Sequence, residues 1–452
     1  MKIFVPEKLN KLAELCPENL YIVGGYVRNA LGFGVISDDV DIAGDLSFGS
    51  LSELAEKIGF RAIAFYKTTG TGVLSDGERN YEFARFRTEK YERGGGHTPA
   101  ETENTSDVTT DALRRDFKCN AVYYDIKNEK IVDPLGGVED IGARVLDTVR
   151  PAAEVFSRDG LRLMRLARFA AETGFTPTKA VLTAAKTYAH NITDISAERI
   201  YCELNKILVA DAKYPFSPKD GHYRGLKILD ETRVLDELFP ELTAGRGMSQ
   251  RSDYHNHDVL EHSLRAALYA DADIRLAALL HDIGKPFAMK KYDSFSRHAE
   301  YGAKIAEIAL ERLKTDKKTV KETVFLVKEH YRDTDCTCPE RELRRFFADN
   351  LPRLDKLFRL KTADHYAHKD DLSACPSVVK WRKLLCEMKS DGTPFSVREL
   401  KITAAELKKI GYTGKEIGEE LDGLRRECVD EPKLNARETL EALAIKNYES
   451  RR

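Results

Sequence analysis

The sequence predicts a multidomain protein with an α/β domain at its N-terminus and an all-helical remainder. The chain has 452 residues, enough for about three domains at ~150 residues each. Segments rich in β-branched and aromatic residues, which are typical of strands, occur before Arg150. From Ser157 onward, apolar residues recur at spacings of three and four, which is typical of helices.

The N-terminal domain is predicted to begin with a short amphipathic helix within residues 1–20. Strands are expected at residues 20–23, 61–66, 72–74, 81–86 and 121–125. Between the last two, residues 93–110 contain three glycines, a proline and many polar side chains. We expect this stretch to be a mobile loop, because it is too polar to be buried.

Breaks in the helical pattern divide the rest of the chain. Residues 213–223, 245–252 and 392–394 are rich in proline, glycine and polar residues, which interrupt helices. We therefore expect four domains, an α/β head at 1–145, a helical neck and body at 146–250, a histidine-rich helical domain at 251–372 and a helical tail at 373–452.

Composition excludes several classes of protein. The 72 basic and 74 acidic side chains give a formal charge of −2, which excludes a uniformly basic nucleic-acid-binding surface. No apolar run approaches the ~18 residues of a membrane span, and the N-terminus does not read as a signal peptide. Eight cysteines are too sparse for a disulfide framework. We expect a cytoplasmic enzyme without a membrane, and no protein partner is implied.

The strongest chemical signal is a glycine pair followed by an arginine and two aspartates. Gly24 and Gly25 follow the first predicted strand, and Arg28 lies one turn later. A glycine turn before a helix lets backbone amides approach a phosphate, and an arginine adds a bidentate contact. Asp39 and Asp41 alternate along a predicted strand, so both carboxylates share one face and suit Mg²⁺. Alone, each element is equally consistent with a turn or a solvated acidic loop; their combination favours a nucleotide site.

These residues identify a resemblance. The segments GGYVRN at 24–29 and DDVDIA at 38–43 resemble the head motif of class II tRNA nucleotidyltransferases. This family contains the CCA-adding enzymes and bacterial poly(A) polymerases, and its head has a polymerase-β-like palm. Four further segments extend the resemblance, YEFARFR at 81–87, DALRRDFKCNA at 111–121, DPLGG at 133–137 and SAERI at 196–200.

The resemblance assigns roles to individual residues of the head. It implies that Glu82 is the third catalytic carboxylate beside Asp39 and Asp41, and that Arg115 contacts the triphosphate. One departure is Asn29, which stands where the family usually has aspartate. We expect this asparagine to weaken a contact with a neighbouring residue of the site, but it removes no metal ligand.

A second motif lies at the start of the helical region. Asp159, Arg162 and Arg165 lie at intervals of three positions, which predicts one helical face. Such a face is also compatible with a plain surface ion pair worth ~0.3 kcal/mol. The segment resembles the family's protein template, which implies that Asp159 and Arg162 select the incoming base. Arg165 and Arg168 are then triphosphate or base contacts.

The histidine-rich region has adjacent His281 and Asp282 after a predicted apolar helix, with His262 upstream and Asp364 downstream. This order resembles the HD phosphohydrolase superfamily, and the resemblance implies that these four residues bind a metal ion. His298 and His330 extend the pattern toward the two-metal version. A mixed nitrogen and oxygen set suits a divalent transition metal or Mg²⁺. The alternative is a degenerate HD domain that is retained as a helical scaffold for RNA.

The function implied by the resemblance is the addition of CCA to the 3′ end of tRNA. CTP and ATP would be the substrates, pyrophosphate the leaving group, and Mg²⁺ the cofactor in the head. The tail resembles the tRNA-binding tail of CCA-adding enzymes, although composition alone is equally compatible with a plain packing domain. A poly(A) polymerase, a partial enzyme that adds only CC or only A, and an HD phosphohydrolase remain the alternatives.

Overall fold

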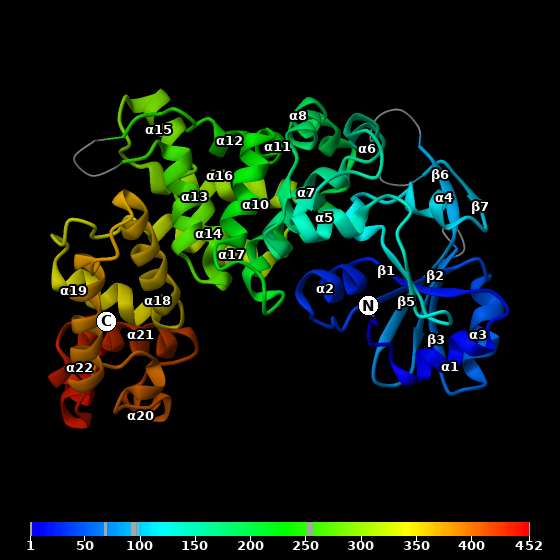
Figure 1. The fold of residues 1–452 in the computed structure, drawn as a ribbon. Helices are drawn as coiled ribbons and strands as arrows, with labels where there is room; N and C mark the ends of the chain where they lie inside the picture. Colours follow the sequence, from blue (N-terminus) through cyan, green and yellow to red (C-terminus); the bar gives the residue numbers. More distant parts are fainter. Residues whose placement is uncertain (1, 67–69, 92–95, 97–98, 251–255, 452) are drawn as a thin grey trace. The chain divides into compact units, whose positions relative to one another are not determined.

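The computed structural model describes residues 2–451 except 67–69, 92–95, 97–98 and 251–255. The chain forms two compact units (Figure 1). Unit 1 comprises Met1–Thr243 with Ala309–Thr315, and unit 2 comprises Ala244–Ile308 with Asp316–Arg452. Each unit is described by itself.

A seven-stranded mixed sheet forms the head within unit 1. The strands are β1 (Leu20–Val23), β2 (Val40–Gly44), β3 (Arg61–Tyr66), β4 (Thr71–Ser75), β5 (Asn80–Arg85), β8 (Tyr123–Asp125) and β9 (Lys130–Val132). Their order is β3-β4-β5-β2-β1-β8-β9. Only β2 and β5 pair in parallel within this sheet, among the residues described. The predicted α/β head is confirmed.

Helices cover the head sheet and the turn after β1. They are α1 (Glu7–Leu15), α2 (Gly25–Phe33), α3 (Phe48–Glu56) and α5 (Gly137–Ala143). Helix α1 packs on α3, which in turn contacts β3, β4 and β5 (Figure 1). Leu9, Leu12 and Leu51 are fully buried in this layer, because apolar residues at helical spacing place one face against the sheet.

The expectation of a loop over 93–110 is wrong in part. Strands β6 (Arg87–Lys90) and β7 (Glu101–Asn104) form an antiparallel hairpin, and α4 (Val108–Ala112) follows. All four side chains of β7 are exposed, so no apolar alternation marked the strand. The Asp107 carboxylate accepts hydrogen bonds from the amides of Thr109 and Thr110 and caps α4. Residues 93–95, 97 and 98 lie outside the described residues.

The rest of unit 1 is helical. Its helices are α6 (Ala152–Arg158), α7 (Leu161–Thr173), α8 (Lys179–Thr187), α9 (Ala197–Leu208), α10 (Gly221–Glu231), α11 (Val234–Leu238) and α12 (Pro240–Thr243), with a two-residue pairing of β10 (Val145–Leu146) and β11 (Thr176–Pro177). Asp159 is extended, with φ −146°, between α6 and α7. The predicted single helix through this motif is therefore wrong. The next residue, Gly160, lies close to Asn191, because a Cβ there would be 2.1 Å from the carbonyl oxygen of Asn191.

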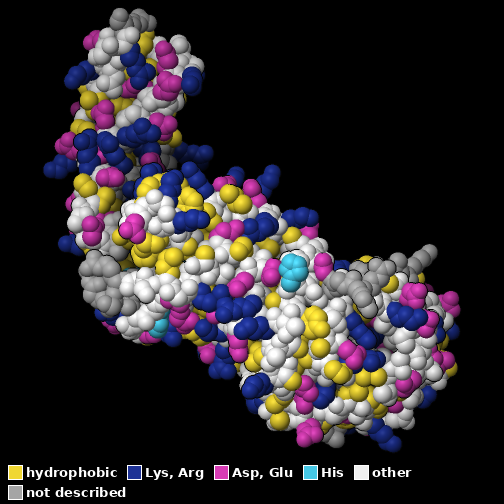
Figure 2. Space-filling view, turned by 90° about the horizontal axis from the view of Figure 1, so that it is seen from above, with side chains coloured by type: hydrophobic (Ala, Val, Ile, Leu, Met, Phe, Trp, Pro, Cys, Tyr) yellow, Lys and Arg dark blue, Asp and Glu magenta, His cyan; other side chains and the backbone are white. Residues whose placement is uncertain are grey.

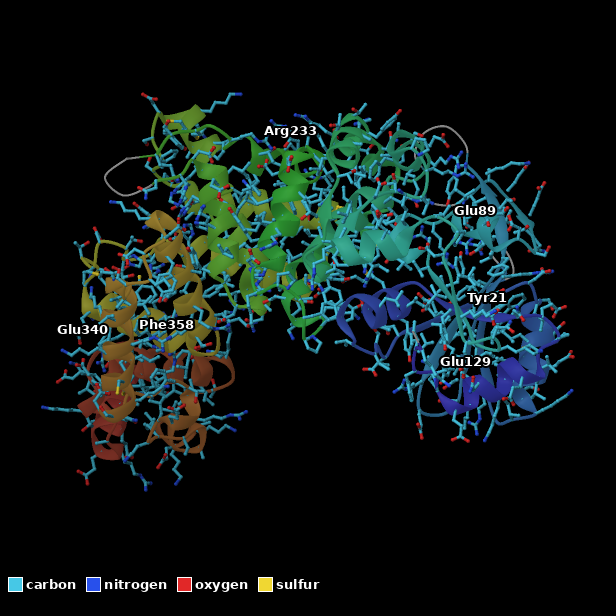
Figure 3. The ribbon with its side chains drawn as sticks, in the orientation of Figure 1. Tyr21, Glu89, Glu129, Arg233, Glu340 and Phe358 are labelled. Carbon is cyan, nitrogen blue, oxygen red and sulfur yellow. The ribbon has the colours of Figure 1, made fainter. Side chains whose placement is uncertain are left out.

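Unit 2 is all-helical. Its helices are α13 (Val259–Tyr269), α14 (Arg275–Leu280), α15 (Lys285–Tyr292), α16 (His298–Arg312, whose last turn belongs to unit 1), α17 (Lys317–Glu329), α18 (Glu340–Lys369), α19 (Pro376–Ser390), α20 (Ala404–Ile410), α21 (Lys415–Asp430) and α22 (Arg437–Ser450). Helix α18 kinks at Asn350, where φ is −126°, just before Pro352, because proline disturbs the preceding turn. The main core of unit 2 contains Trp381 and Phe358, of which Phe358 is labelled in Figure 3.

The visible face in Figure 2 carries charges of both signs. Basic and acidic side chains both occur over it, and basic ones gather in several places. Among the described residues, no helix is both long and apolar enough to span a membrane.

Candidate active site

One cavity in unit 1 collects the predicted residues of the head and neck. It has a volume of about 1250 Å³. All eleven of the predicted residues line it, Gly24, Gly25, Arg28, Asp39, Asp41, Glu82, Arg115, Asp159, Arg162, Arg165 and Arg168. They come from segments as far apart as β1 and α7, so tertiary packing brings them to one place.

Three carboxylates gather on the sheet side of the cavity. Asp41 of β2 and Glu82 of β5 are register partners, so their side chains lie on the same face. Asp39 lies just before β2, and its carboxylate accepts a hydrogen bond from Lys213 Nζ at 3.1 Å. Burial raises the pKa of Asp41 to about 6; Arg115 opposes this shift, and Glu82 and Asp39 reinforce it. A divalent cation fits such a set, because it would relieve the repulsion among the carboxylates.

The turn after β1 requires glycine. Gly24 has φ +79°, and a Cβ there would lie 2.9 Å from Oδ2 of Asp41. The backbone of this turn therefore lies against the acidic group. Gly25 begins α2, so the amides at the start of this helix are available to an anion.

Arg28 is buried, and among the described residues the hydrogen-bond partners of its guanidinium are neutral. Its Nε and a terminal nitrogen donate to Oδ1 of Asn29, at 3.0 and 2.9 Å, and the other terminal nitrogen donates to Oδ1 of Asn120 at 2.6 Å. Asn29 in turn donates to Ser37. The amide of Asn29 orients Arg28 without neutralising it, so the departure from the family's aspartate leaves a positive charge for an anion.

Buried carboxylates position the other arginines. Asp111 is fully buried and accepts from Tyr123 and Arg114, at 2.7 Å each, and from Arg115 at 3.2 Å. Arg115 also donates to the Tyr123 hydroxyl at 2.9 Å. These contacts hold the Arg115 guanidinium at the cavity wall.

Asp116 provides a second buried anchor. It accepts from Arg165 Nε at 2.7 Å, from the amide of Phe117 at 2.8 Å and from Asn120 at 3.3 Å. Burial raises the pKa of Asp116, but the guanidinium groups of Arg165 and Arg162 outweigh burial and hold it below its usual value. Arg168 is paired with Glu203 at 2.6 Å and with Glu172 at 3.3 Å.

The Asp159–Arg162 pair forms despite the break in the helix. The carboxylate accepts from the amide of Leu161 at 2.9 Å and lies 3.5 Å from Arg162 Nε. Both side chains are almost fully buried, so few orientations are open to them. A carboxylate and a guanidinium side by side present an acceptor and donors to the edge of a base.

Sequence reasoning missed several residues of this cavity. They include Glu89, Tyr91, Arg114, Asp116, Asn120, Lys213, Tyr214, Ile63 and Tyr66. Asp116 and Asn120 lie in the motif quoted around Arg115, so proximity in the sequence was a usable signal. Glu89 (Figure 3) accepts a hydrogen bond from Arg87 at 2.7 Å within the unexpected hairpin region. Lys213 follows α9. No motif in the surrounding sequence marked either residue as part of a site.

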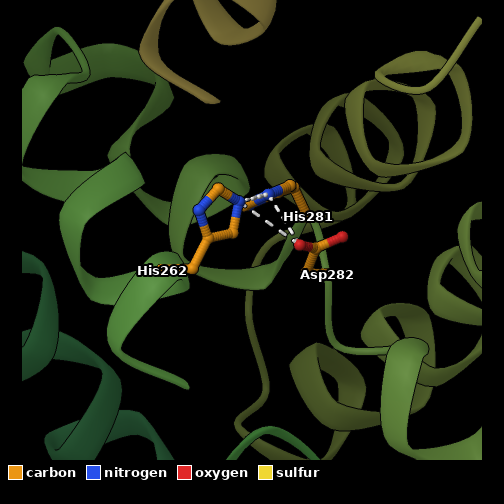
Figure 4. A group of neighbouring side chains, drawn as sticks. All are labelled: His262, His281 and Asp282. Carbon is orange, nitrogen blue, oxygen red and sulfur yellow. Dashed lines mark hydrogen bonds and ion pairs between the residues drawn. The ribbon is translucent and has the colours of Figure 1, made fainter. Parts of the chain in front are cut away.

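Unit 2 contains a separate cluster of histidines and aspartates. His262 of α13 has its Nε2 3.2 Å from Nε2 of His281 and 2.9 Å from Oδ1 of Asp364 in α18. Asp282 Oδ2 lies 3.2 Å from His281 Nε2 and 3.4 Å from His262 Nε2 (Figure 4). All four predicted ligands therefore meet.

His298 and His330 complete this cluster on the other side of Asp282. Oδ1 of Asp282 lies 3.3 Å from His298 Nε2 and 3.6 Å from His330 Nε2. The two Nε2 atoms are 3.2 Å apart. Nδ1 of each ring lies 2.8 and 2.7 Å from a backbone carbonyl oxygen, which fixes the proton on Nδ1 and leaves a lone pair on Nε2.

The charges of the cluster are strongly coupled. Burial lowers the pKa of His281, but the carboxylates of Asp282 and Asp364 outweigh burial and raise it to about 10. Burial lowers the pKa of His330 to about 4. Groups of three or more ligand atoms from these residues lie within 4.8 Å of one another, which is the spacing around a bound ion.

Three family descriptions match successive parts of the chain. The Poly A polymerase head domain matches residues 20–147, the probable RNA- and SrmB-binding site of polymerase A matches 174–245, and the HD domain matches 259–367. The first match spans the sheet with its three carboxylates. The third spans all six residues of the histidine–aspartate cluster.

Curated relatives cover most of the chain. A "Multifunctional CCA protein" of Hahella chejuensis is 29% identical over 432 residues, 90% of this chain and 94% of its own length. Another from Xylella fastidiosa is 30% identical over 325 residues, 69% of this chain and 73% of its own length. An "A-adding tRNA nucleotidyltransferase" of Deinococcus radiodurans is 30% identical over 378 residues, 79% of each chain.

Solved structures show the same fold. The Bacillus stearothermophilus CCA-adding enzyme in complex with CTP superposes with a TM-score of 0.67 at 22% identity and covers 99% of both chains. The Thermotoga maritima CCA-adding enzyme complexed with tRNA has a TM-score of 0.61 at 16% identity, covering 98% of this chain and 96% of its own.

We predict that Asp116→Asn lowers the free energy of unfolding by about 1.5–3 kcal/mol at pH 7, because it removes a buried charge-assisted hydrogen bond. The folded-state pKa of Asp116 is depressed, so its contribution is present above the unfolded pKa of about 3.9 and declines as the pH falls below it. Urea unfolding followed by circular dichroism at pH 7 and at about pH 3 measures this. Asp220→Asn, which breaks an exposed pair with Arg224, is the control, and equal effects of both variants would contradict the prediction.

Proposed function

Because this chain belongs to the family of tRNA nucleotidyltransferases that contains the multifunctional CCA proteins, we propose that it adds C, C and A to the 3′ end of tRNA. CTP and ATP are the substrates, and pyrophosphate is released. The observation that carries the proposal is the single cavity in which the carboxylates, the anion-binding turn and the Asp159–Arg162 pair meet.

The acidic group is where the nucleotidyl transfer occurs. Asp39 and Asp41, with Glu82 beside them, would hold Mg²⁺, which neutralises the triphosphate and activates the terminal ribose hydroxyl. The hydroxyl oxygen bonds to the α-phosphorus, the bond to the pyrophosphate oxygen breaks, and the hydroxyl proton leaves to solvent. The protein's own contribution is to position the two reactants and to stabilise charge.

Arginines and backbone amides hold the nucleotide. The amides at Gly24 and Gly25 and the un-neutralised guanidinium of Arg28 suit the triphosphate. Arg115, oriented by Asp111 and Tyr123, supplies a further positive charge. Asp159 accepts from the exocyclic amino group of cytosine or adenine, and Arg162 donates to the adjacent ring nitrogen. Guanine and uracil present the opposite pattern on this edge.

The alternative activities within the family differ in their product. One of them, addition of A alone, is the activity in the name of the relative from D. radiodurans. An assay with tRNA lacking its terminal CCA and with tRNA ending in CC, and with CTP and ATP supplied separately and together, separates them. Full addition gives three nucleotides only with both substrates. A CC-adding enzyme stops after two, an A-adding enzyme extends only tRNA that already ends in CC, and a poly(A) polymerase makes long products from ATP alone.

We predict that Asp39→Asn and Asp41→Asn each lower the rate of nucleotide incorporation by about 10³-fold, because each removes charge at the site of transfer. Single-turnover incorporation of labelled CTP into tRNA measures the effect. Asp38→Asn is the matched control, because Asp38 is exposed, adjacent in sequence and absent from the cavity lining. Near-normal rates for both cavity variants would contradict the assignment of the head.

We predict that Asp159→Ala and Arg162→Ala reduce discrimination against GTP and UTP by at least about tenfold, because the lost groups read the base edge rather than the triphosphate. The measurement is kcat/KM for all four nucleotides. Arg158→Ala is the control, since Arg158 pairs with Glu154 outside the cavity. An equal loss for all four nucleotides would refute a role in base selection.

The histidine–aspartate cluster supports a second activity, a metal-dependent phosphohydrolase in unit 2. The two oxygens of Asp282 face different histidine pairs, an arrangement suited to two divalent ions with a shared carboxylate. Lone pairs on the Nε2 atoms of His298 and His330, 3.2 Å apart, repel each other unless a cation or proton lies near both. Ions held by these residues would supply a hydroxide nucleophile and charge stabilisation.

We predict that the purified protein retains close to two divalent ions in unit 2 and hydrolyses bis(p-nitrophenyl) phosphate. Asp282→Asn should lower both metal content, measured by mass spectrometry, and hydrolysis, measured by absorbance, while CCA addition persists. Asp355→Asn, an exposed carboxylate of α18 paired with Arg359, is the control. A wild-type protein without metal or hydrolysis would show instead that this domain is a helical scaffold.

A further inference from the structure

An apolar surface on the edge strand of the head has no role in the chemistry described above. Ile63 and Tyr66 of β3 are 61% and 58% exposed, and both line the cavity. Sheet edges usually carry charged residues that prevent unwanted pairing. Large apolar side chains that share one exposed surface mark a binding site instead.

The register of the sheet connects this surface to the catalytic carboxylates. Asp41, Glu82, Val73 and Ala64 are successive partners across β2, β5, β4 and β3, so their side chains share one face. Ala64 lies two strand spacings from Glu82, which is about 10 Å. Tyr66 is two residues further along β3 and therefore lies on the same face.

A bulge brings Ile63 to this face as well. The register of β3 with β4 shifts between Ala62 and Ala64, and Ile63 is the additional residue. Bulges beside active sites redirect a side chain, and here Ile63 and Ala64 both line the cavity. Phe65 has a different role, because its ring stacks on Phe48 with centroids 5.1 Å apart.

The two reactants must approach the carboxylates from different sides. The anion-binding groups come from segments attached to β1 and β8, since Arg28 follows β1 and Arg115 bonds to Tyr123 of β8. In the strand order, β1 and β8 lie on one side of β2, and β4 and β3 lie beyond β5 on the other. A nucleoside triphosphate on the arginine side leaves the β3 side for the RNA.

We propose that Ile63 and Tyr66 form the platform on which the 3′-terminal base of the RNA acceptor stacks. This inference rests on the proposed nucleotidyltransferase function. Stacking on an aromatic ring tolerates any base, because every base has a π face. Such a platform suits an acceptor whose terminal base changes after each addition.

The test compares variants of the full-length protein in CTP incorporation. Tyr66→Ala should raise the KM for tRNA lacking CCA about tenfold, with the KM for CTP unchanged within twofold. Ile63→Ala should also raise the KM for this tRNA. Tyr66→Phe should restore the wild-type KM, because the ring is kept. Phe4→Ala, an exposed aromatic residue outside the cavity lining, should have no effect.

A binding measurement gives a readout that is independent of turnover. In a tRNA with 2-aminopurine at its 3′ end, the fluorescence of the 2-aminopurine should be quenched when the tRNA binds to the wild type or to Tyr66→Phe. The fluorescence should persist when it binds to Tyr66→Ala. Unchanged KM and quenching in Tyr66→Ala, with an active wild type, would overturn the platform alone. A wild type that binds this RNA but incorporates no nucleotide would overturn the proposed function.

Discussion

The active site depends on the pairing of buried charges in the cavity wall. Asp111 and Asp116 each lie at the centre of several hydrogen bonds and hold Arg115 and Arg165. An unpaired charge at either position would be costly to bury. The carboxylates therefore determine which guanidinium groups stay within the wall and which face the cavity.

Arg28 shows how this constraint produces function. Its partners in the wall are amide oxygens rather than carboxylates, so its position is determined while its charge stays available. Arg168 shows the opposite case, because Glu172 and Glu203 both pair with it. The glycine-turn motif predicted a phosphate contact for Arg28 and the resemblance implied a nucleotide contact for Arg168, and the structure distinguishes the two arginines by their partners.

The near-zero net charge is also related to the pairing of arginines with carboxylates. A total of 72 basic and 74 acidic side chains initially argued against a nucleic-acid partner. Many acidic groups, however, are paired with the arginines of the cavity or gathered where a metal would neutralise them. Modest overall charge also limits non-specific phosphate contacts, each of which would strengthen binding and its salt dependence.

The sequence alone predicted the family, the fold class and the candidate site residues of this protein. It identified the α/β head, several strands within a residue or two, and the predicted members of the carboxylate, arginine and histidine–aspartate groups, because these depend on local pattern and motif; it missed Glu89, Arg114 and Asp116 of the cavity. It could not identify the β6–β7 hairpin, since the side chains of β7 are all exposed. It also placed Asp159 on a helix, whereas its backbone is extended; the following residue, Gly160, lies against Asn191, a contact between segments that a local pattern does not reveal.

Only the tertiary structure decided how these groups act together. Lys213 meets Asp39 across 174 residues, Asp282 is shared by two histidine pairs, and Ile63 and Tyr66 lie on the same face as Asp41. Such relations depend on strand register and on packing between distant segments. A one-dimensional pattern specifies the residues of a site, whereas their distances, burial and pairing are set by the folded chain.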